Sequence, residues 1–153
     1  MRLPRTSILF AAIALATGCG GASPDWGARL ERSEVTCRGV PTDVHPLEHA
    51  EVLAARRIGG FEGRPRRFRT RGARLLVRPR PDTSPDQLER WSQCLAERWS
   101  LHHLEERPSH DPLAVEGVEI DVRSGPSGHE IWMTANEQRA GQEIYRRALE
   151  AVD

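Results

Sequence analysis

The chain has 153 residues and a formal net charge of zero, and all 22 of its basic residues are arginine. This length suits one domain and excludes a large multidomain protein. Aromatic residues are few, but four of them are tryptophans and predict a real hydrophobic core: Trp26, Trp91, Trp99 and Trp132.

The first nineteen residues are organised like a secretion signal. Arg2 and Arg5 precede an uncharged run from Ser7 to Ala16, and small residues continue up to Cys19. The run is far shorter than the roughly 20 residues that a helix needs to cross a bilayer, so it predicts a signal peptide rather than a membrane span. An ordinary export signal cut near Ala16 is the alternative.

The letters ALATGC, residues 14–19, resemble the lipobox of bacterial lipoproteins. The resemblance implies that residues 1–18 are removed and that lipid on the Cys19 thiol holds the protein at an envelope membrane. Gly20 is not the aspartate that often retains lipoproteins at the inner membrane, which implies the outer membrane, facing the periplasm. Glycine, serine and proline then predict a flexible tether over residues 19–33, followed by a globular domain over 34–153.

With Cys19 assigned to lipid, Cys37 and Cys94 remain as one pair in a chain addressed to an oxidising compartment. Export, together with an even number of remaining cysteines, favours a disulfide between them. Closing a loop of this length would contribute about 4 kcal/mol. Two buried free thiols are the alternative, and a two-cysteine metal site is disfavoured because neither has a CxxC partner.

The first predicted helix runs from Pro46 to Ile58. Pro46 suits a first helical turn, an apolar stripe follows at helical spacing (Leu47, Ala50, Leu53, Ala54), and Gly59 with Gly60 ends it. Residues 60–72 predict an arginine-rich irregular segment with at most a short strand near Phe68. A strand is then expected from Ala73 to Arg78.

The second half of the chain carries clearer local signals. Ser84, Pro85 and Gln87 predict a capped helix start, followed by an apolar stripe that includes Trp91 and Trp99. Alternation over 118–123 predicts a half-buried strand, 125–128 a turn and 129–133 its hairpin partner. Thr134 with Glu137 predicts a second capping box before the last helix, whose apolar residues are Ile144, Tyr145, Ala148, Leu149 and Val152.

These elements predict a small α+β domain with an antiparallel sheet packed by helices, in the order α-β-α-β-β-α. The part from Ala73 to Val152 resembles a ferredoxin-like βαββαβ unit that lacks its last strand. The segment near Val35 could fill the vacant edge. The chain also resembles small bacterial lipoproteins in its ALATGC, ERWSQCLAE, VEIDVRS and EIYRRAL segments, which implies a lipoprotein domain and no activity.

Charge is unevenly distributed along the chain. Residues 56–80 contain ten arginines and one acid, whereas residues 81–153 contain seven arginines and fifteen acids. Arginine binds phosphate and carboxylate in two-point geometry. Anionic lipid, lipopolysaccharide or an acidic envelope protein is therefore a candidate partner, and nucleic acid is not. The alternative is that the basic segment pairs with the acidic half. The candidate anion-binding residues are Arg64, Arg66, Arg67, Arg69 and Arg71.

Histidines supply a second candidate site. His102, His103 and His110 lie in a segment rich in acidic side chains, and imidazole favours zinc or copper. His45 and His49 have ligand spacing, but Pro46 places His45 outside a regular helix. A mobile polar loop explains the first group equally well, and surface histidines explain the second.

No catalytic signature emerges. Consecutive Ser109, His110 and Asp111 cannot usually converge as a triad, and there is no G-x-S-x-G segment. We therefore expect a non-enzymatic interaction or structural module without a cofactor, anchored through Cys19. A periplasmic metal-binding protein is the alternative.

Overall fold

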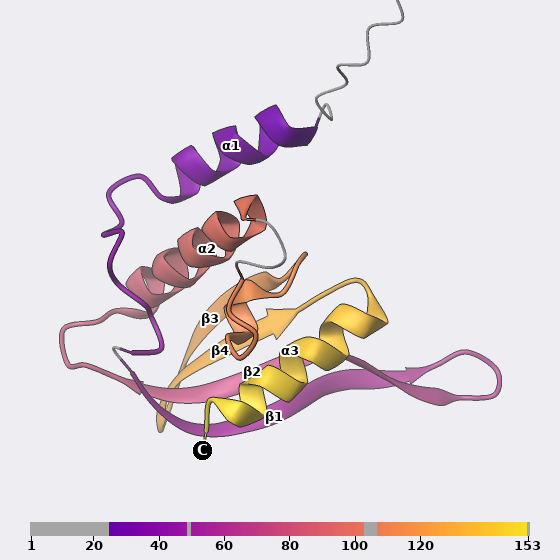
Figure 1. Cartoon of the computed structure of the whole chain (residues 1–153). Helices are drawn as coiled ribbons and strands as arrows, with labels where there is room; N and C mark the ends of the chain where they lie inside the picture. Colours follow the sequence, from indigo (N-terminus) through magenta and orange to yellow (C-terminus); the bar gives the residue numbers. More distant parts are fainter. Residues whose placement is uncertain (1–24, 49, 103–106, 153) are drawn as a thin grey trace, which may run out of the picture.

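The computed structural model describes residues 25–48, 50–102 and 107–152 (Figure 1). In chain order the elements are helix α1 (Asp25–Thr36), strands β1 (Ala50–Glu62) and β2 (Arg67–Pro79), helix α2 (Pro85–Leu101), the 3-10 helix η2 (Pro112–Ala114), strands β3 (Glu119–Gly125) and β4 (Gly128–Thr134), and helix α3 (Gln138–Glu150). This confirms a small single α+β domain in which helices pack on an antiparallel sheet. The predicted order of elements is matched, with one strand added before β2; from β2 onward each predicted element also falls where it was expected, whereas the first helix is α1 rather than residues 46–58.

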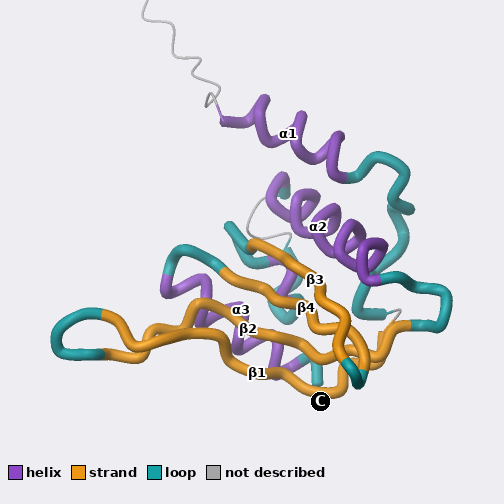
Figure 2. Tube along the Cα trace, turned by 180° about the vertical axis from the view of Figure 1, so that it is seen from behind, coloured by secondary structure: helices purple, strands orange, loops and turns teal. Residues whose placement is uncertain are grey.

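The four strands form one sheet in the order β1-β2-β4-β3, and every neighbouring pair is antiparallel. Strand β4 thus lies between β2 and β3, the two strands that α2 connects. The vacant edge beside β2 is filled by β1 (Figure 2). The expectation that the segment near Val35 fills it was wrong, because Val35 lies in α1 and is 62% exposed.

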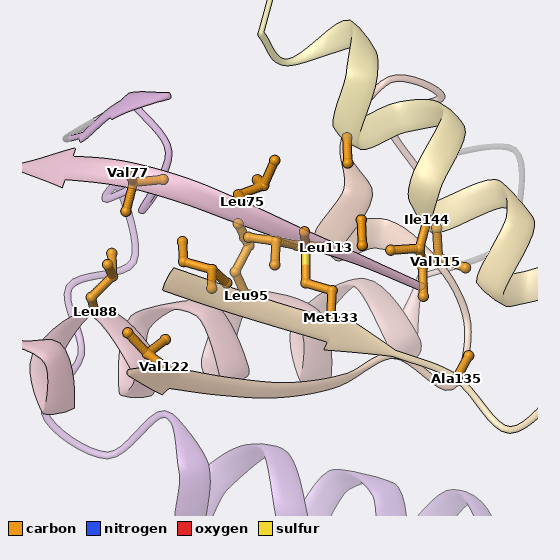
Figure 3. Packing of buried hydrophobic residues seen from close by; sticks show 13 residues of the cluster. Leu75, Val77, Leu88, Leu95, Leu113, Val115, Val122, Met133, Ala135 and Ile144 are labelled. Atoms are coloured by element: carbon orange, nitrogen blue, oxygen red, sulfur yellow. The ribbon is translucent and has the colours of Figure 1, made fainter. Parts of the chain in front are cut away.

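One face of the sheet carries the core. Alternate residues of β2 and β4 point to this face and are fully buried, among them Leu75, Ile131 and Met133. Helices α2 and α3 both cover it, and Leu88 and Ile144 belong to the same cluster as the strand residues (Figure 3). Because apolar burial contributes about 25 cal/mol per Å², this shared face is the main source of stability.

The helix predicted from Pro46 to Ile58 was wrong, since most of this range is strand β1. It pairs with β2 from Ala50 opposite Pro79 to Glu62 opposite Arg67. The same pairing corrects residues 60–72, which were expected to be irregular and instead form the end of a β1–β2 hairpin. A four-residue turn, Gly63–Arg66, joins the two strands.

Helix α1 occupies much of the range predicted as a tether. It begins at Asp25, packs on α2, and buries Ser33, so the folded part starts before residue 34. Cys37 follows α1 directly and is bonded to Cys94 in α2, with sulfur atoms 2.07 Å apart and Cα atoms 4.8 Å apart. The predicted cysteine pair is confirmed.

The two predicted capping boxes had different outcomes. The Ser84 hydroxyl accepts a hydrogen bond from the Gln87 backbone N–H at the start of α2, as expected. The N-cap of α3 is Glu137, which makes no side-chain capping bond. The box predicted from Thr134 was wrong, because Thr134 is still paired within β4.

Among the described elements no helix packs on the opposite face of the sheet, which carries paired charges. Arg74 of β2 contacts Glu130 of β4 at 3.2 Å, and its guanidinium lies 5.3 Å from the centre of the Trp132 ring. Arg123 of β3 lies over the same ring at 4.5 Å and is also bonded to Asp121. On this face, therefore, Arg74 and Arg123 are each matched by a carboxylate.

Candidate functional site

The β1–β2 hairpin extends beyond the rest of the sheet. Strand β4 pairs with β2 only between Gly72 and Val77, whereas β1 accompanies β2 down to Arg67. Residues 59–71 therefore form a two-stranded projection, here named the hairpin tip (Figures 1 and 2). Gly63 begins its turn with a φ of 78°, a backbone conformation that suits glycine.

Two of the candidate anion-binding arginines are paired inside the hairpin tip. The Glu62 carboxylate accepts hydrogen bonds from Arg71 at 2.8 and 3.2 Å and from Arg69 at 3.3 Å. Arg69 also donates to the Asn136 carbonyl at 3.2 Å. These bonds, with Arg71 contributing most, hold the pKa of Glu62 below its ordinary value, so this carboxylate is charged and already matched.

The other three candidates are unpaired and exposed. Arg64 and Arg66 lie in the turn, and Arg67 begins β2. Within the described part of the chain, none of the three forms a hydrogen bond, an ion pair or a ring contact. The structure thus separates the arginines that sequence reasoning grouped together.

Two aromatic side chains accompany these arginines. Phe61 and Phe68 face each other across the hairpin in a T-shaped contact, with ring centres 5.4 Å apart. Phe61 is 69% exposed, whereas Phe68 is covered in part by Arg57, whose guanidinium lies 4.5 Å from its ring centre and 5.8 Å from that of Tyr145 in α3. The hairpin tip is therefore fixed at its base and presents a large apolar side chain beside free cationic ones.

Pairing between the basic segment and the acidic half is limited. Arg74 reaches a carboxylate of that half, on Glu130, and Arg78 bonds instead to Glu51 of β1. The alternative of internal neutralisation holds for Arg69 and Arg71 at the base of the hairpin tip and for Arg74 and Arg78 in the sheet, but not for Arg56, which lies opposite Arg74 and is exposed without a partner among the described residues. Internal neutralisation does not account for the arginines of the turn, Arg64 and Arg66.

The histidine cluster is only partly visible in the described residues. His102 and His110 are exposed, and His103 lies outside the described residues, as does His49. Within residues 25–48, 50–102 and 107–152, no three His, Cys, Asp or Glu side chains are close enough together to hold a metal ion.

His45 has a structural contact that spacing did not predict. Its Nε2 atom lies 3.1 Å from a carboxylate oxygen of Asp111, whose other oxygen accepts the Leu113 N–H at 2.8 Å. The hydrogen bond to Asp111 raises the pKa of His45, although burial opposes the shift. Asp111 is buried and faces His45 rather than His110, so residues 109–111 do not form a triad.

Comparisons with other proteins found no match: no family model, no curated protein and no solved structure is similar to this chain. None of the helices in the described residues has the length and apolar character that crossing a membrane requires. The proposed lipid site, Cys19, lies outside the described residues.

Proposed function

We propose that this protein is a lipid-anchored, non-enzymatic interaction module of the bacterial envelope, which presents the hairpin tip to its partner. The observation that carries the interaction role is the contrast between two sets of arginines. Arg74 and Arg123 on the open sheet face are matched by carboxylates, whereas three arginines close together in the hairpin tip, Arg64, Arg66 and Arg67, are not. Exposed cations with an exposed aromatic neighbour suit contact with an anionic surface.

The anchor is supported by the resemblance of residues 14–19 to a lipobox and by the disulfide, which suits an exported protein. Mass spectrometry of membrane-extracted protein should find a mature chain that begins at Cys19 and carries diacylglyceryl and acyl groups. It should fractionate with the outer membrane. A chain that begins elsewhere and stays free in the periplasm would reject the anchor.

The metal-binding alternative makes a different prediction for purified protein. An interaction module should contain far less than one equivalent of zinc or copper after purification without chelator. A protein that uses His102, His103 and His110 should retain stoichiometric metal and lose it when those residues are replaced by alanine. Elemental analysis separates the two functions.

A further inference from the structure

We infer that the hairpin tip binds the surface of an anionic lipid bilayer, and in the cell the same bilayer that holds the chain at Cys19. The second half of this inference rests on the anchor proposed above. The first half rests on the structure of the hairpin tip alone and is tested without the anchor.

The direction of the hairpin supports contact with the anchoring membrane. The first turn of α1, at the top of the molecule, and the hairpin tip, at the bottom, both point to the right in Figure 1 and to the left in Figure 2. Only residues 20–24 separate Cys19 from the start of α1. Even fully extended, that stretch spans about 20 Å. A lipid on Cys19 would therefore keep this side of the molecule close to the bilayer.

The chemistry of the hairpin tip fits lipid phosphates. A guanidinium group binds a phosphate through two parallel hydrogen bonds, and Arg64, Arg66 and Arg67 can do so without breaking an existing ion pair. Glu62, the one acid in residues 59–71, would repel phosphate if it were free, but Arg69 and Arg71 already neutralise it.

Phe61 favours a bilayer over a soluble anion. Phe61 is 69% exposed and lies near the end of β1, two residues before the turn begins at Gly63. Aromatic side chains are stabilised at the boundary between lipid headgroups and acyl chains, while neighbouring arginines remain at phosphate level. A free polyanion would use the arginines but would give Phe61 no apolar environment.

The test uses the chain from residue 19 to 153 with Cys19→Ser, which contains every described element and carries no lipid. It should co-sediment with vesicles that contain phosphatidylglycerol and not with vesicles of phosphatidylcholine alone. Binding should weaken steeply between about 0.1 M and 1 M salt, because the screening length falls from about 10 Å to about 3 Å.

Matched variants locate the contact. Replacing Arg64 and Arg66 by glutamine should weaken binding at least tenfold, given about 1 kcal/mol per arginine near an anionic surface. Replacing Arg38 and Arg80 by glutamine removes the same charge from exposed positions outside the hairpin tip and should change binding less than twofold. Lysine at 64 and 66 should restore part of the binding, because it restores the charge but not the two parallel hydrogen bonds of a guanidinium group.

The apolar contribution has its own pair of variants. Phe61→Ser should weaken vesicle binding severalfold and leave binding to soluble polyphosphate unchanged. Leu149→Ser, at a residue of α3 that is 43% exposed, is the control and should leave both unchanged. Superimposable unfolding curves for all variants would show that these effects do not come from loss of the fold.

Three outcomes would overturn the inference. One is equal loss of binding in the two arginine pairs, which would indicate general charge attraction. Another is binding to polyphosphate or to an acidic protein without binding to vesicles. The third is binding to both kinds of vesicle alike. None of these outcomes depends on Cys19, and mass spectrometry tests separately whether Cys19 carries lipid.

Discussion

Gly141 is a point of very close approach between helix α3 and strand β2, and its replacement by alanine tests how that helix is packed. A Cβ atom at residue 141 would lie 2.6 Å from the carbonyl carbon of Arg71 and 2.7 Å from the carbonyl oxygen of Thr70. Ordinary contacts begin near 3.4 Å, so the helix would have to move by about 0.8 Å. Both atoms belong to the backbone, so no side-chain rotation can relieve the contact.

The expected loss of stability combines two opposing effects. Alanine is favoured over glycine inside a helix by about 1 kcal/mol. Overpacking a core costs about 1–3 kcal/mol, and here the displaced helix carries Ile144 and Ala148, both fully buried. Because the clash is with backbone, we take the upper end of that range and expect Gly141→Ala to lower the free energy of unfolding by about 2 kcal/mol.

Urea unfolding followed by circular dichroism without reductant measures this loss. Gly27→Ala is the matched control, because Gly27 also lies in a helix, α1, and a Cβ atom there would meet nothing within 4 Å. Only helix propensity acts at that position, so stability should stay the same or rise by up to about 1 kcal/mol. If Gly141→Ala proved as stable as the parent, α3 could not be seated against the β2 backbone as described.

Two further predictions concern the disulfide and the half-buried His45. Cys94→Ser should lower stability by about 4 kcal/mol, and a thiol reagent without reductant should label neither cysteine of the native parent; labelling of both would contradict the bond. The hydrogen bond to Asp111 raises the pKa of His45. The stability that this bond adds to the fold is therefore complete below about pH 6.5 and is lost as the pH rises through the pKa of His45 in the folded protein. His45→Gln should therefore lower the urea midpoint more at about pH 5.5 than at about pH 9, and equal effects at both would disprove the coupling.

Strand β1 shows why apolar spacing alone assigned a helix to a strand. The ladder with β2 shifts register between Val52 and Ala54, which is the mark of a β-bulge. As a result Val52 and Ala55 both pack against the core although they are three residues apart, so the strict alternation that marks a strand is absent. The predicted helical stripe relied instead on Leu53 and Ala54, which do not belong to the core cluster. Alanine, leucine and arginine also favour helices locally, and only pairing with β2 overrides that preference.

Elements whose signals are local were predictable. The β3–β4 hairpin follows from strict alternation around Val122 and a turn between Gly125 and Gly128, which pair with each other in the structure. The start of α2 follows from the chemistry of Ser84 and its neighbours. Neither depends on a distant part of the chain, and in both the tertiary contacts agree with the local pattern.

Which arginines of the hairpin tip are paired and which are unpaired could not be predicted from the sequence. Glu62 lies opposite Arg67 in the ladder, yet it bonds to Arg69 and Arg71 further along the same strand. Which arginines remain free depends on strand register and on side-chain direction, and both follow from the hairpin. Sequence reasoning found the density of charge there but not its pairing.

The position of the disulfide determines how a pull on the N-terminus would reach the body of the protein. Cys37 immediately follows α1, and its bond to Cys94 enters α2 within the helix rather than at either end. Tension along α1 would therefore pass through a covalent link into a helix that packs on the core, and would bypass the connection from residue 38 to β1. Strand β1 lies at the sheet edge, where hydrogen bonds can separate one at a time, so this route shields the hairpin from being peeled off when the anchored chain is stretched.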